Sequence, residues 1–245
     1  MVPPYSIEDL RRKVSGKDPL KIFLLYEGAN TEKYLINPLL SSNTIVASTN
    51  IVFKAINKEK NDSGITDPFS LIKYAKHIIQ KEISCRNFIS GRDKIMIVFD
   101  LDVLKNDQTK MNELLKMRTN DMILCYTNPS IELFMLLTIA NGYETIVAPN
   151  SSEIIKNNYD ENGDRYVYGL LKKSIPELKD TKREKDIDFS YVISNIDKAF
   201  YQENFINSRL TNAANRLTSN IAHVITKISK NDFDIRYWYI SYSSH

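Results

Sequence analysis

Two short apolar runs of the chain end in acidic residues. Residues 21–26 lead directly into Glu27, and residues 94–99 lead into Asp100 and Asp102. Continuous apolar runs of this length are typical of parallel strands that are covered on both faces, and a short buried helix is the alternative. Glycines beside both runs favour strands. The pattern therefore predicts two buried strands that carry carboxylates at their ends.

Helix signals separate these runs from other predicted strands. Asp67–Pro68 suits the start of a helix that ends near residue 83, and Asn128–Pro129 repeats this signal for a helix that runs to Ala140. Further helices are predicted at residues 31–40 and 110–118, and further strands at 44–56 and 122–126. The alternation of strands and helices predicts an α/β fold with a parallel sheet and right-handed crossovers.

The chain is expected to divide into three parts. Residues 1–20 form a polar segment with a short helix, residues 21–142 form the α/β domain, and residues 143–245 form a mostly helical extension. The extension either completes the core or is appended to it. Its pattern predicts two amphipathic helices within 185–230 and a closing strand at 233–240.

The acidic strand ends indicate metal chemistry. In an open α/β sheet, ligands gather outside the carboxyl ends of the strands, so Glu27, Asp100 and Asp102 are expected to meet there. Asp100 and Asp102 are separated by one residue and would share a face of an extended strand. Mg²⁺ keeps several waters and is commonly held by one or two carboxylates, so this pair suffices for one ion. The alternative is a solvated acidic turn that closes the strand.

Three motifs together resemble the Toprim fold and, within it, the RloB-like subfamily. They are residues 27–34, EGANTEKY; residues 100–102, DLD; and residues 126–137, YTNPSIELFMLL. The resemblance covers roughly residues 20–140 and implies a Rossmann-like parallel sheet flanked by helices. Three positions depart from the family pattern, because Val103 replaces an aspartate, Phe134 a tryptophan and Thr138 a histidine. Asp107 would replace the acid that position 103 lacks, unless it is only a solvated loop residue.

The same resemblance implies roles for individual residues. Glu27 would be the general acid/base, with metal ligation as the second option; burial beside apolar neighbours would raise its pKa, and a nearby Mg²⁺ would lower it. Glu32 would complete a second metal site and Glu132 would join it; the alternative for each is an acid that stabilises a helix first turn by roughly 0.3–1 kcal/mol. From the residues themselves, Gly28 suits a tight turn close to a phosphate, and the helix that begins near Thr31 offers an anion site.

Composition and charge limit the class of protein. With 245 residues, 42% of them hydrophobic and 26% charged, and a net charge of +3, the chain has no global field for binding a polyanion. Cys85 and Cys125 are too few for a disulfide framework or a zinc cage, which favours the reducing cytosol. No apolar run approaches the roughly 18 residues of a membrane span, and the first residues lack signal-peptide character. We therefore expect a soluble, cytoplasmic protein without a membrane partner.

The densest basic segment lies in the C-terminal part. Its candidates for nucleic-acid binding are Lys172, Lys173, Lys182, Arg183 and Lys185. These side chains would line a phosphate track beside the acidic site, because carboxylates cannot hold a polyanion unaided. The alternative is a solvated face of mixed charge.

The RloB-like resemblance implies a Mg²⁺- or Mn²⁺-dependent endonuclease that cleaves RNA, such as tRNA, or DNA. It also implies a toxic effector of anti-phage abortive infection or restriction. It further implies an ABC-type ATPase as a partner in trans, and the absence of a GxxxxGK[ST] loop from this sequence agrees with that. Whether the chain forms a homo-oligomer is left open by the sequence. The alternatives are a non-catalytic module that binds metal or nucleic acid and assembles with the ATPase, and nucleotidyl transfer as in primases, against which the missing companion domains count.

Overall fold

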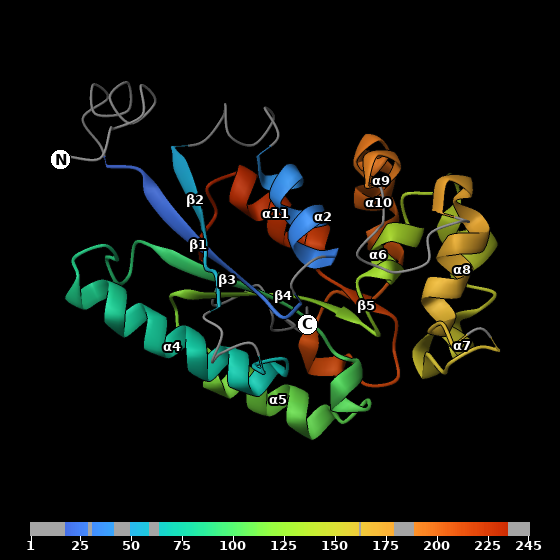
Figure 1. Cartoon of the computed structure of the whole chain (residues 1–245), viewed down its shortest axis with the longest axis horizontal. Coiled ribbons are helices and arrows are strands. Elements are labelled where there is room, and N and C mark those ends of the chain that lie inside the picture. Colours follow the sequence, from blue (N-terminus) through green and yellow to red (C-terminus); the bar gives the residue numbers. More distant parts are fainter. Residues whose placement is uncertain are drawn as a thin grey trace, which may run out of the picture.

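The computed structural model describes residues 18–28, 31–41, 50–58, 64–161, 163–178 and 189–234. Within these ranges a five-stranded sheet forms the centre of the molecule, in the order β2-β1-β3-β4-β5 (Figure 1). Its strands are β1 (Leu20–Tyr26), β2 (Ile51–Ala55), β3 (Lys94–Asp100), β4 (Met122–Asn128) and β5 (Thr218–Ser219). The first four strands are parallel, and β5 runs antiparallel to β4. The α/β class and the parallel sheet of residues 21–142 are confirmed, and the C-terminal part adds a short antiparallel edge strand.

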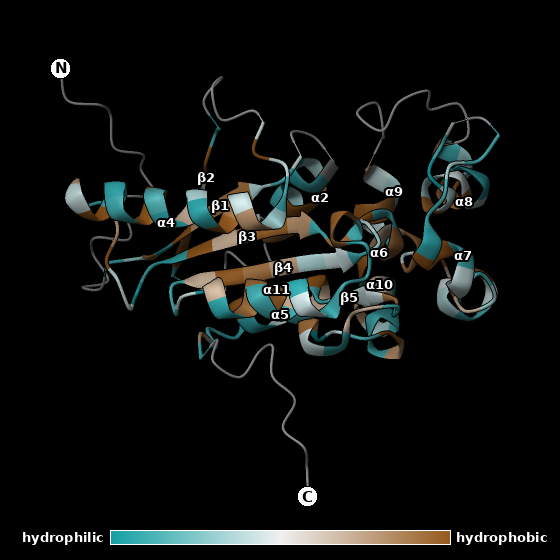
Figure 2. Cartoon of the chain, turned by 90° about the horizontal axis from the view of Figure 1, so that it is seen from below, coloured by the Kyte–Doolittle hydropathy of each residue, from teal (hydrophilic) through white to brown (hydrophobic). Residues whose placement is uncertain are grey.

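Helices cover both faces of the sheet. α4 (Pro68–Ser84) and α5 (Gln108–Met117) lie on one face, and α2 (Thr31–Leu40) and α11 (Ile221–Ser229) lie on the other (Figure 1). Figure 2 shows that apolar residues are concentrated on the strands and on the sides of the helices that face them. Residues 95–99 of β3 are all buried, as the continuous apolar run predicts for a strand covered on both faces.

The order of the strands creates a switch point between β1 and β3. After β1 the chain crosses through α2 to β2, and it returns through α4 to β3 on the other side of β1. Because such crossovers are right-handed, the reversal moves the connecting helix from one face of the sheet to the other. Ligands of open α/β sheets bind in the crevice that this reversal leaves at the carboxyl ends of the strands. Glu27 follows β1 and Asp100 ends β3, so both residues lie at this crevice.

A lobe of short helices lies beyond the carboxyl ends of β3 and β4 (Figure 2). It consists of α6 (Glu132–Leu136), α7 (Ser151–Lys156), α8 (Tyr166–Ser174), α9 (Ser190–Ser194) and α10 (Ile196–Gln202). The prediction of two amphipathic helices within 185–230 is wrong for the described part of that range. This part contains three α-helices instead of two. Asn195 separates α9 from α10, and β5 precedes α11. Among the described residues, no helix is long and apolar enough to cross a membrane.

The start of α4 confirms the signal read from Asp67–Pro68. The Asp67 side chain is the N-cap, and its Oδ1 accepts a hydrogen bond of 3.0 Å from the backbone N–H of Ser70. This bond satisfies one of the N–H groups that the first helical turn leaves without a partner.

The helix predicted from Asn128–Pro129 to Ala140 is wrong at both ends. Asn128 belongs to β4, and α6 comprises only Glu132–Leu136. Asn128 lies four residues before α6 and is not its N-cap, and its Nδ2 donates hydrogen bonds of 3.0 Å to the backbone oxygens of Ala213 and Arg216. Long-range contacts with the C-terminal part therefore override the local signal.

Three predicted elements lie partly or wholly outside the described residues. They are the short helix within residues 1–20, the first part of the strand at 44–56 and most of the closing strand at 233–240. The described part of the 44–56 segment contains β2.

Candidate functional site

A cleft of about 410 Å³ lies at the carboxyl ends of β1 and β3. Its lining residues are Glu27, Gly28, Glu32, Thr66, Asp100, Asp102, Val103, Ser130, Glu132, Asn157 and Arg165. All five carboxylates that the sequence singles out as metal ligands line it, although they come from the end of β1, from α2, from β3, from the turn after β3 and from α6. The switch point of the sheet is what brings these separate segments together.

Glu27 is held by the neighbouring strand. The backbone N–H of Asp100 donates a hydrogen bond of 2.9 Å to Glu27 Oε2, and Lys58 Nζ donates one of 2.6 Å to the Glu27 backbone oxygen. The pKa of Glu27 is raised to about 8, mainly by burial and also by the charges of Glu32 and Asp102, while the Asp100 N–H and Lys58 oppose the rise. In the protein without a cation, this carboxyl group therefore exchanges its proton close to neutral pH.

Asp100 is the acidic residue of the cleft that ends β3. Burial raises its pKa well above the ordinary value, and the charges of Glu32 and Glu132 add to this effect. One stabilising contact opposes the rise, because Thr127 Oγ1 on β4 donates a hydrogen bond of 2.6 Å to Asp100 Oδ1. Ionised Asp100 thus lacks sufficient counter-charge, which is the condition in which a carboxylate gains most from a bound cation.

Asp102 lies just after the end of β3. It begins a 3₁₀ turn (Asp102–Leu104) and its side chain is 27% exposed. Burial raises its pKa, and the guanidinium of Arg165, with Nη2 at 3.8 Å from Asp102 Oδ2, opposes that rise. The expected extended arrangement of Asp100 and Asp102 is therefore wrong, since the chain turns between them, but both still line the cleft.

Glu32 and Glu132 combine helix-start and cleft positions. Both lie in the first turn of a helix and are buried. The Gly28 N–H donates a hydrogen bond of 3.1 Å to Glu32 Oε1, and a Cβ atom at Gly28 would lie 2.5 Å from Glu32 Oε2. Ser130 Oγ donates a hydrogen bond of 2.5 Å to Glu132 Oε2. The absence of a side chain at Gly28 therefore leaves space for the Glu32 carboxylate, in addition to the predicted close approach of Gly28 to a phosphate.

The donor set suits a hard divalent cation. Within the described ranges, no three histidine, cysteine, aspartate or glutamate side chains form a ready metal-binding group. Mg²⁺ does not need one, because it is usually bound through one or two carboxylates and several waters. Five carboxylates line the cleft together with one basic side chain, so the repulsion among them favours a bound cation. Asp100 and Asp102 would hold it, with Glu27 as a further ligand only in the second of its two expected roles.

Two other predicted residues, Asp107 and Thr31, are not among those that line the cleft. Asp107 is the N-cap of α5, where its Oδ1 accepts a hydrogen bond of 2.9 Å from the backbone N–H of Thr109. Asp107 therefore caps a helix and does not line the cleft, which supports the alternative to its role as a replacement ligand. Thr31 begins α2 next to the cleft, as expected for the predicted helix start.

The predicted basic track is described only in part. Lys172 and Lys173 lie in the last turn of α8, and Lys172 Nζ forms an ion pair of 2.8 Å with Asp164. Neither lysine lines the cleft. The other members of the track, Lys182, Arg183 and Lys185, lie outside the described residues, so the track stays a prediction.

Four further residues approach the acidic groups without a clear signal in the sequence. Thr66, Asn157 and Arg165 line the cleft, and Lys58 contacts the backbone of Glu27. They lie in loops or at helix starts, where no periodicity marks them. Ser130 differs, because it stands inside the motif of residues 126–137 and could have been read from it.

Comparison with known proteins identifies the family. No curated protein and no solved structure gives a significant match to the chain. A family model described as RloB-like protein matches residues 22–231, a range that holds all five cleft carboxylates and most of the chain. The chain therefore belongs to the RloB-like protein family.

Proposed function

We propose that the chain is a Mg²⁺- or Mn²⁺-dependent nuclease that hydrolyses phosphodiester bonds of RNA or DNA. The observation that carries this proposal is the meeting of Glu27, Asp100 and Asp102, with two further glutamates, in a cleft at the switch point of the sheet. The Toprim-like motifs of residues 27–34 and 100–102 support the same reaction class.

The residues of the cleft divide the chemistry between them. A bound divalent cation would stabilise negative charge on the phosphate and lower the pKa of a bound water. Asp100 and Asp102 would hold that ion, and Glu32 and Glu132 would support it from their helix starts. Glu27 would transfer the proton, because its side chain is fixed by the Asp100 N–H; burial raises its pKa, and the bound cation would lower it again toward the neutral range.

A cleavage assay tests this proposal. Purified protein is incubated with end-labelled tRNA and with supercoiled plasmid, in Mg²⁺ or Mn²⁺ and in chelator. We expect metal-dependent cleavage of at least one substrate by the wild type and none by Glu27→Gln. Glu153→Gln is the matched control, because Glu153 is exposed, pairs with Lys156 and does not line the cleft. Binding without cleavage by the wild type would instead favour the non-catalytic module.

We extend the proposal to the cellular setting. The chain would act in the cytosol as the effector of an anti-phage system, under the control of an ABC-type ATPase, since its own sequence has no P-loop. Expression of the chain without the ATPase should arrest growth, and Glu27→Gln or Asp100→Asn should each abolish the arrest at equal protein level. Arrest that survives both substitutions would exclude the cleft as its cause.

A further inference from the structure

Arg165 brings a positive charge from the C-terminal part into the acidic cleft. It lies directly before α8, and within the described residues it is the one basic side chain among those that line the cleft. The cleft must accept a polyanion if the proposed function is right. We infer that the Arg165 guanidinium binds the phosphate of the substrate and stabilises its charge during cleavage, an inference that rests on the proposed function.

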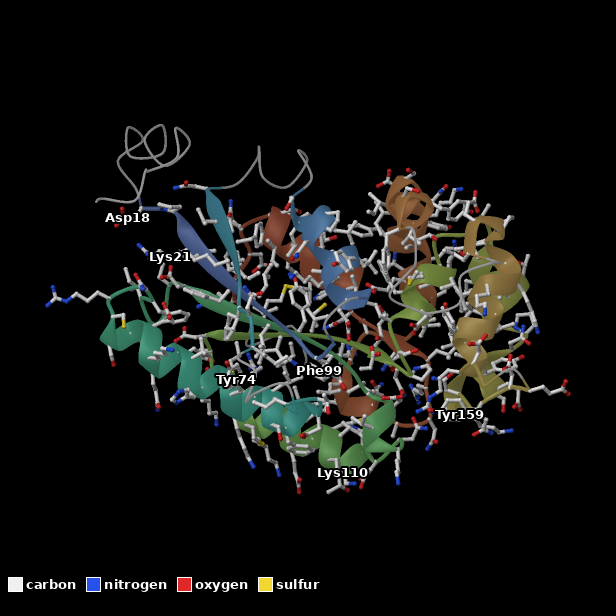
Figure 3. The ribbon with its side chains drawn as sticks, in the orientation of Figure 1. Asp18, Lys21, Tyr74, Phe99, Lys110 and Tyr159 are labelled. Carbon is white, nitrogen blue, oxygen red and sulfur yellow. The ribbon has the colours of Figure 1, made fainter. Side chains whose placement is uncertain are left out.

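The guanidinium is positioned by neutral groups. Arg165 Nη1 donates a hydrogen bond of 3.2 Å to the backbone oxygen of Asn157, and the guanidinium carbon lies 4.4 Å from the centre of the Tyr159 ring. Tyr159 and Arg165 also form an antiparallel β-bridge, which closes the loop between them. Figure 3 labels Tyr159 on the helical lobe, near α7. These contacts fix the side chain before any substrate binds.

The distance between Arg165 and Asp102 is too long for neutralisation of Asp102 to be the main role of Arg165. An arginine that serves to neutralise a carboxylate usually makes two short, parallel hydrogen bonds with it. Here the nearest nitrogen is 3.8 Å from Asp102 Oδ2, beyond hydrogen-bond distance, and the Arg165 side chain is 41% exposed. A guanidinium has five N–H donors, and the bond to Asn157 uses one of them. Other donors of this side chain, which lines the cleft, therefore remain, and the planar fork of a guanidinium matches a phosphate.

Lys58 does not provide the same function. Its Nζ donates hydrogen bonds of 2.6 Å and 2.8 Å to the backbone oxygens of Glu27 and Ile65, and the residue does not line the cleft. Lys58 thus stabilises the end of β1, whereas Arg165 is the basic group of the described cleft that a substrate can reach.

Kinetics with substituted Arg165 test the inference. On whichever labelled nucleic acid the wild type cleaves, we expect Arg165→Ala to lower kcat/KM about 100-fold, the size typical for the loss of one transition-state donor. Arg165→Lys should recover part of this loss, because it keeps the charge but not the fork. Arg209→Ala is the matched control, since Arg209 is exposed and does not line the cleft.

The ring beneath the guanidinium gives a second, independent variant. Tyr159 is 66% exposed, so its replacement should leave the core intact. We expect Tyr159→Leu to lower kcat/KM about 2- to 5-fold, because an exposed cation–π contact is lost, and Tyr159→Phe to restore the activity.

A binding measurement separates this inference from the nuclease proposal. Fluorescent RNA and DNA of one sequence are titrated in Mg²⁺ with Glu27→Gln and with Glu27→Gln/Arg165→Ala. At least tenfold weaker binding by the second protein is expected, even if the wild type proves unable to cleave, which would remove only the nuclease proposal. Unchanged binding and unchanged kcat/KM in the Arg165 variants would overturn the inference alone. If Arg165→Ala changes the Mg²⁺-induced melting shift but neither nucleic-acid binding nor kcat/KM, Arg165 acts only on Asp102 and the inference is wrong. If none of the proteins binds nucleic acid, both proposals are wrong.

Discussion

The backbone N–H of Asp100 donates a hydrogen bond of 2.9 Å to Glu27 Oε2, so the end of β3 fixes the carboxylate that follows β1. The bond uses the main chain of Asp100, and its side chain is left to accept from Thr127. Asp100→Asn should therefore remove a charge from the cleft without releasing Glu27. Substitutions at the two positions report on two separate functions, cation binding and proton transfer.

Cation binding should stabilise the fold. An ion that binds only the folded state adds RT ln(1 + [L]/Kd), roughly 2.7 kcal/mol at a hundredfold excess over Kd. Millimolar Mg²⁺ or Mn²⁺ should raise the melting temperature of the wild type and leave that of Asp100→Asn/Asp102→Asn unchanged, as measured by differential scanning fluorimetry. Equal shifts in both proteins would place the ion elsewhere.

Stability of the cation-free protein should fall as pH rises. The pKa of Glu27 is about 8 in the folded protein against an ordinary value of 4.5, so between these values the folded state holds a proton that the unfolded chain has lost. The corresponding stability is complete below pH 4.5 and is lost as pH approaches and passes 8. Burial raises the pKa of Asp100 and Asp102 as well, which acts in the same direction.

Thermal melts in chelator across neutral pH measure this effect. We expect the melting temperature of the wild type to fall between about pH 6 and pH 8 more steeply than that of Glu27→Gln, which isolates Glu27 from other titrating groups. Saturating Mg²⁺ should flatten the fall, because the cation favours the ionised carboxylate. Identical slopes for wild type and Glu27→Gln in chelator would contradict the assigned burial of Glu27.

Gly28→Ala should displace Glu32 without disturbing the fold. The new Cβ atom would lie 2.5 Å from Glu32 Oε2, and the end of a flexible side chain can move away at small cost. If Glu32 supports the cation, Gly28→Ala and Glu32→Gln should both reduce the Mg²⁺-induced melting shift. Gly64→Ala is the control, since nothing lies within 4 Å of its added Cβ atom. An unchanged shift in both variants would leave Glu32 only its helix-start role, worth roughly 0.3–1 kcal/mol.

The positions of the acidic site residues could be predicted from the sequence. Glu27 and Asp100 follow continuous apolar runs, and parallel strands bring their carboxyl ends to one edge, so pattern and topology together place both residues. Glu132 was accessible only through the motif of residues 126–137, because a first-turn acid is common in any helix.

The remainder depends on long-range contacts that no local pattern records. Arg165 meets Asp102 across a separation of 63 positions, the difference between 165 and 102, through a loop without periodicity. The two residues of β5 are too few to form a pattern, and the adjacent Asn220 binds β4 through its side chain, at 2.8 Å from the Tyr126 N–H and 2.9 Å from the Leu124 oxygen. Such contacts also explain why Asn128 ends a strand instead of starting a helix.

The basic segment outside the described residues should contribute affinity for nucleic acid. Each phosphate contact that is lost should lower the salt slope by about 0.9 for duplex DNA and about 0.7 for a single strand. Lys182→Ala/Arg183→Ala/Lys185→Ala is therefore expected to weaken binding and flatten its salt dependence, with the Mg²⁺-induced melting shift unchanged. Binding and slope equal to wild type would make this segment a solvated face.

The central claim is that the carboxylates of the cleft hold a divalent cation. Anomalous diffraction from crystals soaked in Mn²⁺ tests it most directly, because the signal locates the metal itself. We predict a peak in the cleft within coordination distance of Asp100, with Asp102 or Glu27 as a second ligand, and no such peak in Asp100→Asn/Asp102→Asn. A wild-type crystal that binds Mn²⁺ only outside the cleft, or an equal peak in the double variant, would contradict the account.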